Sequence, residues 1–174
     1  MLVYHGSKEL FERFDYKKMG TNGTMEGKGF YFTDTKKIAE HYAQNGYLYT
    51  VKFNGKKSLS SDNKTITRQQ LKKYLKALDE KLDYLSNWGD KDYDGLDKVM
   101  NEAINGEYDG SDNDVDMIAG IVNTSGDTED SLTLLYEILG YDSIVCTEVD
   151  WGEEQKIYIA LINDIIKIID IQKI

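Results

Sequence analysis

The feature that most constrains the fold is an acidic, helix-rich middle that separates two strand-rich ends. Residues 79–130 carry 16 Asp and Glu against 3 Lys, whereas the rest of the chain carries 15 acidic and 18 basic residues. Apolar residues recur at helical spacing in the middle, and short alternating runs occupy both ends. This order predicts an α+β domain. The length of 174 residues predicts a single domain, residues 1–174, with a helical insertion at about 66–139.

Apolar periodicity and turn residues give the expected elements. Strands are expected at 2–4, 30–33, 47–53, 142–147, 157–161 and 165–171. Helices are expected at 8–16, 34–44, 67–85, 96–105, 115–122 and 131–139. Asp34 and Thr67 are the predicted N-caps of the second and third helices, because their side-chain oxygens can accept hydrogen bonds from free backbone N–H groups.

Charge and composition exclude several classes of function. A net charge of −10 argues against general binding to nucleic acids or anionic membranes. One cysteine, Cys146, rules out an internal disulfide, and two histidines are too few for an ordinary structural zinc site. The run DKDYDG at 90–95 is like the opening of a calcium loop, but Asn101 stands where the bidentate glutamate would be, so a solvated turn is expected and no metal is predicted. The absence of a secretory leader or a membrane-spanning apolar run predicts a cytoplasmic protein.

Four residues near the beginning of the chain have the chemistry of a site for a ribose and a flat aromatic cation. His5 can hydrogen-bond ribose hydroxyls, and Gly6 leaves its backbone open to a carboxamide. Tyr31 and Tyr42 could stack on a pyridinium ring and attract its charge. Alone, each residue also has a simpler interpretation, since His5 could cap a strand and the two tyrosines could belong to the core.

The runs YHGS at 4–7 and MEGKGFYFTDTKKIAEHY at 25–42 resemble segments of poly(ADP-ribose) polymerase-like ADP-ribosyltransferases. They are also similar to ADP-ribosyltransferase domains of phage and mobile-element polyvalent proteins, in which GYDSIV and YIALINDIIK have counterparts. The resemblance covers about half of the chain and implies a split β-sheet around an NAD cleft. It implies that His5 holds a ribose of NAD, that Gly6 binds the nicotinamide amide with Ser7 beside it, and that Tyr31 and Tyr42 enclose the nicotinamide ring.

Two positions depart from the pattern of the polymerases. Ala39 replaces a small hydroxyl residue, which removes one hydrogen bond to the amide. Ile157 aligns with the catalytic glutamate of chain-elongating enzymes, and such a replacement resembles the mono-ADP-ribosylating members. Strand alternation puts Gln155 and Glu153 on the face of Ile157, and Gln155, the nearer of the two, is the candidate third catalytic residue beside His5 and Tyr31.

The resemblance therefore implies a mono-ADP-ribosyltransferase that consumes NAD, releases nicotinamide and modifies a macromolecular target, with a protein as the expected target. The composition suggests a phage or mobile-element effector, a toxin or anti-defence factor, acting in a bacterial or host cytoplasm. Two alternatives stay open. One is a catalytically inactive module that binds partners through its acidic surface, and the other is an NAD glycohydrolase.

Overall fold

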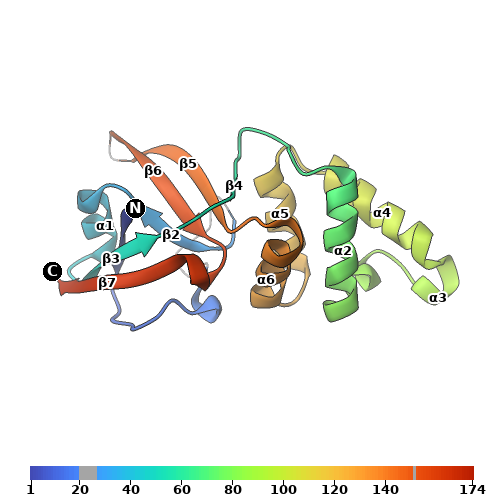
Figure 1. Ribbon diagram of the computed structural model, residues 1–174, viewed down its shortest axis with the longest axis horizontal. Coiled ribbons are helices and arrows are strands. Elements are labelled where there is room, and N and C mark those ends of the chain that lie inside the picture. Colours follow the sequence, from blue (N-terminus) through green and yellow to red (C-terminus); the bar gives the residue numbers. More distant parts are fainter. Residues whose placement is uncertain (20–26, 151) are drawn as a thin grey trace. The chain divides into compact units, whose positions relative to one another are not determined.

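The computed structural model describes residues 1–19, 27–150 and 152–174, with only the backbone of Asp150 and Glu153. The chain forms two compact units. Unit 1 combines residues 1–24, 29–59 and 142–174, and unit 2 combines residues 60–141 with 25–28. The α+β class is confirmed by a seven-stranded sheet and six α-helices in the described part of the chain (Figure 1).

Unit 1 is built on a sheet with the strand order β4-β5-β6-β2-β1-β3-β7. The strands are β1 (Leu2–Ser7), β2 (Phe30–Thr33), β3 (Tyr47–Phe53), β4 (Ser58–Leu59), β5 (Ser143–Asp150), β6 (Glu153–Ala160) and β7 (Ile166–Lys173). Neighbours are antiparallel, except that β4 and β5 are parallel. The strands predicted at 30–33 and 47–53 have the bounds expected, and the other four predicted strands overlap β1, β5, β6 and β7.

The pairing between neighbouring strands is least extensive between β1 and β2, and we call this boundary the seam. Within the described residues, β1 and β2 share one register pair, Tyr4 with Thr33. In contrast, β2 and β6 share four pairs, and β1 and β3 share six. The strands β4-β5-β6-β2 therefore form one half and β1-β3-β7 the other, and these halves correspond to those of the predicted split sheet.

Helix α1 (Lys36–Ala43) connects β2 to β3 and packs on β1, which lies between these strands. It buries Ile38, Ala39 and Ala43 against the sheet. The packing is so close at Gly6 that a Cβ there would lie 1.9 Å from the carbonyl oxygen of Ala39. Glycine at this position is therefore required by the approach of the helix.

The N-cap of α1 is Thr35 and not the predicted Asp34. The Asp34 carboxylate instead accepts from the backbone N–H of Lys156 at 3.2 Å and from the Thr35 hydroxyl at 3.1 Å. The Lys156 carbonyl in turn accepts from the N–H of Asp34 at 3.3 Å. These bonds extend the pairing of β2 with β6, and this competing partner is why Asp34 does not cap the helix.

The segment after β1 is not the helix that its apolar spacing predicts. Residues 8–15 form bends and irregular backbone, followed by a short 3-10 helix at Tyr16–Lys18. The Tyr49 hydroxyl accepts from the backbone N–H of Phe11 at 2.7 Å, and the two rings stack at 4.2 Å between centroids. This contact with β3 replaces the helical hydrogen bonds, because it buries the aromatic side chains of the segment on the sheet.

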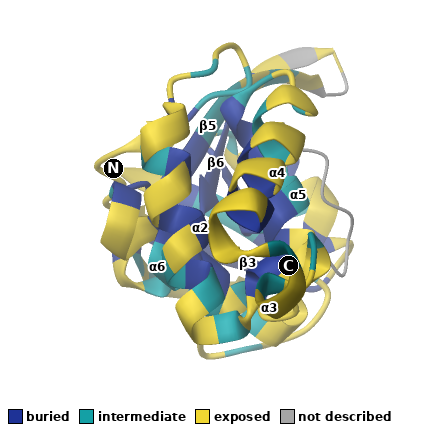
Figure 2. Cartoon of the chain, turned by 90° about the vertical axis from the view of Figure 1, so that its right-hand side faces the viewer, coloured by how far each residue is buried: buried dark blue, intermediate teal, exposed yellow. Residues whose placement is uncertain are grey.

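Unit 2 contains the acidic helices. They are α2 (Arg68–Leu82), α3 (Lys91–Asp94), α4 (Leu96–Asp109), α5 (Asp114–Thr124) and α6 (Thr128–Leu139). Their buried residues, dark blue in Figure 2, line the helix faces that meet within the unit. The predicted cap Thr67 is confirmed: it forms a capping box with Gln70 at the beginning of α2.

A buried carboxylate ties the beginning of α5 to the chain before α2. Asp114 has no exposed surface, and its oxygens accept from the N–H of Thr65 at 2.7 Å, from the Thr65 hydroxyl at 2.6 Å and from the N–H of Ile66 at 3.1 Å. The N–H of Asp114 donates to the Asn63 carbonyl at 3.1 Å. Asp114 thus pairs the N–H of Ile66, a buried residue, which would otherwise lack a partner.

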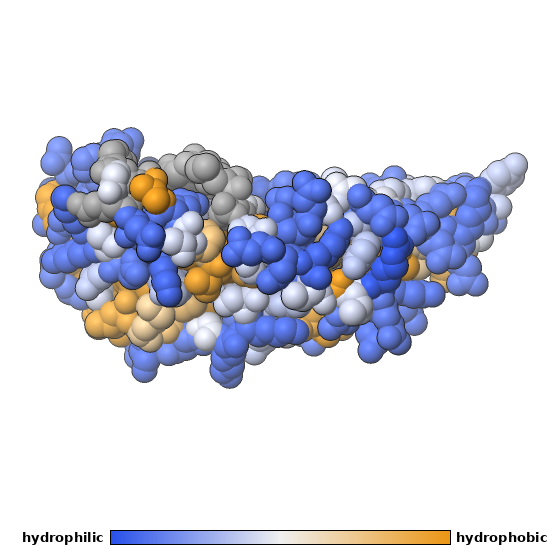
Figure 3. Space-filling view, turned by 90° about the horizontal axis from the view of Figure 1, so that it is seen from above, coloured by the Kyte–Doolittle hydropathy of each residue, from blue (hydrophilic) through white to orange (hydrophobic). Residues whose placement is uncertain are grey.

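The surface of unit 2 is mainly hydrophilic in the view of Figure 3, as the charge of this segment predicts. The calcium-like run forms a helix N-terminus, where the Asp90 carboxylate accepts from the N–H groups of Asp92 and Tyr93. Among the helices described, none is both long and apolar enough to cross a membrane.

Candidate functional site

The side chains of unit 1 separate onto two faces of the sheet. The absent Cβ of Gly6 points at α1, so alternation along β1 turns His5 to the opposite face. Phe30 and Phe32 of β2 contact rings on the face of His5, and alternation therefore turns Tyr31 to the face of α1. We call these the helix face and the aromatic face of the sheet.

The backbone of Gly6 points at the seam. The N-terminal ammonium of Met1 donates to the Phe53 carbonyl at 3.0 Å, and the N–H of Phe53 donates to the Met1 carbonyl at 2.9 Å, so these residues form a hydrogen-bonded pair. In an antiparallel ladder such pairs alternate with pairs that exchange no bonds. Gly6, which faces Leu48, belongs to the second kind, so its N–H and C=O point away from β3 and toward β2.

His5 links the two halves of the sheet across the seam. Its Nδ1 lies 2.8 Å from the carbonyl oxygen of Tyr31. Since a carbonyl can only accept, Nδ1 carries the proton of the neutral ring and Nε2 keeps a lone pair. Four rings surround the imidazole on the aromatic face, with centroids 5.2–5.9 Å from its own: Phe11, Phe14, Phe32 and Tyr49.

Burial among these rings lowers the pKa of His5, and the bond to the Tyr31 carbonyl offsets part of that effect. As the pH falls through the ordinary pKa of about 6.5, the unfolded chain takes up a proton that the folded chain resists. The stability that neutral His5 contributes is therefore complete above pH 6.5 and is lost as the pH falls toward the lowered folded pKa.

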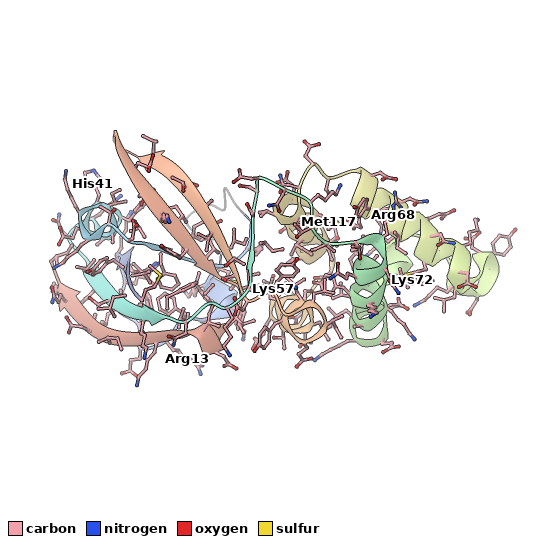
Figure 4. The ribbon with its side chains drawn as sticks, turned by 45° about the horizontal axis from the view of Figure 1, so that its top comes forward. Arg13, His41, Lys57, Arg68, Lys72 and Met117 are labelled. Carbon is pink, nitrogen blue, oxygen red and sulfur yellow. The ribbon has the colours of Figure 1, made fainter. Side chains whose placement is uncertain are left out.

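We expect the free energy of unfolding of the native chain, relative to that of His5→Gln, to decrease between pH 7.5 and 5.5. Urea unfolding at several pH values measures this difference. His41→Gln is the control for the loss of an imidazole, because His41 is exposed on α1 (Figure 4). If the free energies of unfolding of His5→Gln and the native chain changed equally with pH, the folded chain would not hold His5 as a buried, neutral imidazole.

The two tyrosines of the predicted ring site differ in exposure. Tyr31 is half-buried on β2, on the helix face that it shares with Gly6. Tyr42 is 53% exposed and follows Ala39 by three residues, so it lies on the flank of α1 beside the residue that contacts Gly6.

Ser7, at the end of β1, is half-buried, and its hydroxyl accepts from the N–H of Glu9 at 3.1 Å.

The predicted third residue lies farther along the sheet. On β6, Ile159 faces Tyr31 and Ile157 faces Thr33, so both isoleucines are on the helix face. Gln155 shares this face but is four residues from Ile159, which is about 13 Å along a strand. It is also 2% exposed. The side chain of the other candidate, Glu153, lies outside the part of the chain that is described.

The aromatic surroundings of His5 could not be predicted from the sequence. Phe14 and Phe11 come from the irregular segment and Tyr49 from β3, and only the register of β1 with β3 brings His5 opposite Tyr49. The same segment lines a hollow of about 410 Å³ beside the beginning of β7. Arg13, Asn163 and Lys167 contribute polar groups to its lining. The hollow belongs to the aromatic face, because Phe14 lines it.

The arrangement brings four of the predicted residues to the seam: His5, Gly6 and Ser7 on β1 and Tyr31 on β2. Among the described residues, no cluster of three His, Cys, Asp or Glu side chains could hold a metal ion. What the seam offers is a backbone donor and acceptor, a neutral imidazole and an aromatic ring.

Comparisons with curated proteins and with solved structures gave no match. A family model described as ADP-ribosyltransferase in polyvalent proteins matches residues 1–173. The match extends over the acidic helices, which the motifs at the two ends do not include. The chain therefore belongs to the family of ADP-ribosyltransferases found in polyvalent proteins.

Proposed function

We propose that this chain transfers ADP-ribose from NAD to a macromolecular target and releases nicotinamide. The observation that carries the proposal is the backbone of Gly6, whose N–H and C=O point at the seam beside the bond from His5 to Tyr31. A carboxamide offers both donors and an acceptor, so one peptide N–H and one C=O match it. Nicotinamide carries such a carboxamide.

The other residues at the seam fit the rest of NAD. Nε2 of His5 accepts a hydrogen bond from a ribose hydroxyl, while Nδ1 stays on Tyr31. Tyr31 and Tyr42 stack on the nicotinamide ring, and attraction between each ring and the pyridinium charge contributes roughly 0.5–2 kcal/mol. This charge disappears when the glycosidic bond breaks. The rings therefore bind the substrate more strongly than the product. This difference favours dissociation of nicotinamide once the glycosidic bond has broken.

The finer assignments follow from the residues on β6 and from the family. Ile157 cannot replace the glutamate of chain-elongating enzymes, so we propose transfer of one ADP-ribose unit at a time. Gln155 is the polar side chain that we propose to assist from the helix face. We also propose that the protein is an effector of phages or mobile elements that modifies a host protein in the bacterial or host cytoplasm.

Nicotinamide release from NAD, measured by mass spectrometry with and without bacterial lysate, tests the proposal. We expect release only when lysate supplies a target, together with ADP-ribose on a protein of that lysate. Tyr31→Ala should reduce the rate at low NAD concentration roughly 3- to 30-fold, because it removes one stacking ring. Tyr93→Ala is the matched control, since Tyr93 is 89% exposed on α3 and is no part of the proposed site.

Other outcomes identify the alternatives. Equal release from NAD alone would identify a glycohydrolase, because water is then the acceptor. NAD binding without any release would identify an inactive binding module. If the chain binds no NAD at all, the role given to the Gly6 backbone is wrong.

One observation favours the inactive module as a second candidate. Ile157 is 8% exposed and Gln155 is 2% exposed, so the described side chains of β6 on the helix face offer no carboxylate beside Tyr31. In that case the protein would act through the acidic surface of unit 2, which attracts a basic partner.

A further inference from the structure

We propose that two copies of this chain associate through the free edges of their β7 strands, which pair antiparallel with Ile166 of each copy opposite Ile171 of the other. β7 is the end strand of the sheet, and in the described part of the chain it pairs with β3 (Figure 1). An end strand presents backbone N–H and C=O groups that can pair with another strand. This interface lies in unit 1 alone and does not depend on the proposed function.

The free edge of β7 is long and rich in isoleucine. The strand has eight residues, and four of them are isoleucine. Ile169 is 51% exposed, and the other three are half-buried. A long, exposed and apolar edge strand favours association with a further strand, because pairing buries the side chains and satisfies the backbone groups together.

The hydrogen bonds to β3 show which backbone groups of β7 remain for a partner. The N–H of Asn54 donates to the carbonyl of Ile165 at 2.8 Å, so the backbone of Ile165 points at β3. In an antiparallel ladder the direction alternates from residue to residue. Ile166 and Ile168 therefore direct their N–H and C=O groups away from β3, toward the free edge.

A bulge changes this alternation in the middle of β7. Val51 faces Ile168 and Thr50 faces Asp170, so β7 contains one residue more than β3 at this point, Ile169. Beyond the bulge, the direction of the backbone groups is shifted by one residue.

The other end of β7 confirms the shift. The N–H of Ile174 donates to the carbonyl of Gly46 at 3.0 Å, so the backbone of Ile174 points at β3. Alternation from this end directs Lys173 and Ile171 to the free edge. Ile166 and Ile171 thus both present their N–H and C=O groups there, although five positions separate them. In a regular strand residues an odd number apart point to opposite edges, so the bulge is what makes the two equivalent.

This equivalence permits a symmetric antiparallel pair. With Ile166 opposite Ile171 of the second copy, the two residues can exchange both hydrogen bonds, and a two-fold axis passes between positions 168 and 169. The two side chains also share a face. Ile166 faces Phe53 and Ile171 faces Tyr49, and both rings lie on the aromatic face.

Charge complementarity identifies a second copy as the partner. The same register places Lys167 opposite Asp170 of the other copy, and symmetry repeats the pair. Both side chains are exposed, and both lie on the helix face, because they face Lys52 and Thr50, which alternate with Leu48 opposite Gly6. A register shifted by one residue in either direction would place Lys167 opposite an isoleucine and lose both ion pairs.

Sedimentation equilibrium of the full chain tests the proposal with Lys167→Glu, Asp170→Lys and the variant that carries both substitutions. We expect the native chain to dimerise reversibly. Each single substitution turns two attractive pairs into two repulsive ones and should raise the Kd of the dimer roughly tenfold or more. The double variant exchanges the charges and should restore the native Kd within about threefold.

Lys156→Glu is the matched control, because Lys156 is exposed on β6, away from β7, and the change of charge is the same. Its Kd should equal that of the native chain. Circular dichroism of dilute samples shows whether each variant is folded. Amide hydrogen exchange gives a second readout, since the N–H groups of Ile166 and Ile171 should become protected as the concentration of the native chain increases.

The other outcomes overturn the proposal. A native chain that stays monomeric up to about 1 mM does not form this interface. A dimer that both single substitutions leave unchanged uses another surface, and one that the double variant fails to restore has another register. Protection of the Ile166 and Ile171 amides in a monomeric chain would mean that another segment covers the edge.

Discussion

Asp114→Asn should lower the free energy of unfolding by about 2–4 kcal/mol, although the two side chains have almost the same shape. The Asp114 carboxylate is buried and accepts from the N–H groups of Thr65 and Ile66 and from the Thr65 hydroxyl. An asparagine amide has only one oxygen, so in either orientation its NH₂ group faces a backbone N–H. Two donors then oppose each other at a position where the side chain itself is buried. Urea unfolding followed by circular dichroism measures the loss.

Asp116→Asn is the matched control for this substitution. Asp116 lies in the same first turn of α5 but is exposed, and its carboxylate accepts from the Asn113 side chain at 2.8 Å. Removal of its charge should lower the free energy of unfolding by less than about 1 kcal/mol, mainly because the interaction with the helix N-terminus is lost. Equal losses in the two variants would show that Asp114 acts by charge alone and that its buried hydrogen bonds contribute nothing.

Gly6→Ala should abolish nicotinamide release and lower the free energy of unfolding by about 3 kcal/mol. The new methyl group would lie 1.9 Å from the Ala39 carbonyl oxygen and 2.6 Å from the Ala43 nitrogen. These are backbone atoms, so a rotamer change cannot relieve the contact and α1 must move away from β1. The movement displaces Tyr42 relative to Tyr31, and with it the space for the nicotinamide ring. Thermal unfolding and the mass-spectrometric assay measure both effects.

Gly120→Ala makes the same chemical change where the chain has room. Gly120 lies inside α5, and a Cβ there has its nearest neighbour at 3.7 Å, the carboxylate of Glu107. Alanine favours the helix by up to about 1 kcal/mol, so this variant should be at least as stable as the native chain and equally active. A native melting temperature and rate for Gly6→Ala would contradict the close packing of α1 on β1.

The elements that the sequence predicts best are those whose causes are local. The alternation of 47–53 is sufficient to define β3, and Thr67 with Gln70 marks the beginning of α2. The helix predicted at 8–16 is wrong because a residue distant in sequence determines the conformation of this segment. The hydroxyl of Tyr49 on β3 accepts a hydrogen bond from the backbone N–H of Phe11, and the two rings stack. A spacing rule contains no information about such a partner.

The candidate site divides in the same way. His5, Gly6 and Tyr31 are predicted from short motifs, because the chemistry and the backbone freedom belong to the residues themselves. Asp114 looks like a charge that favours a helix N-terminus, and its actual partners stand 48 and 49 residues away.

The seam makes unit 1 an assembly of two parts that are joined less firmly than either part is held internally. Separation of β2 from β1 breaks one ladder pair and the hydrogen bond from His5 to the Tyr31 carbonyl. Separation of β1 from β3 would break six ladder pairs. Backbone amides on the two sides should therefore exchange with deuterium as two groups. A molecule that binds in the seam and contacts both halves should join these groups. Its binding should then change the exchange of amides in strands that it does not contact.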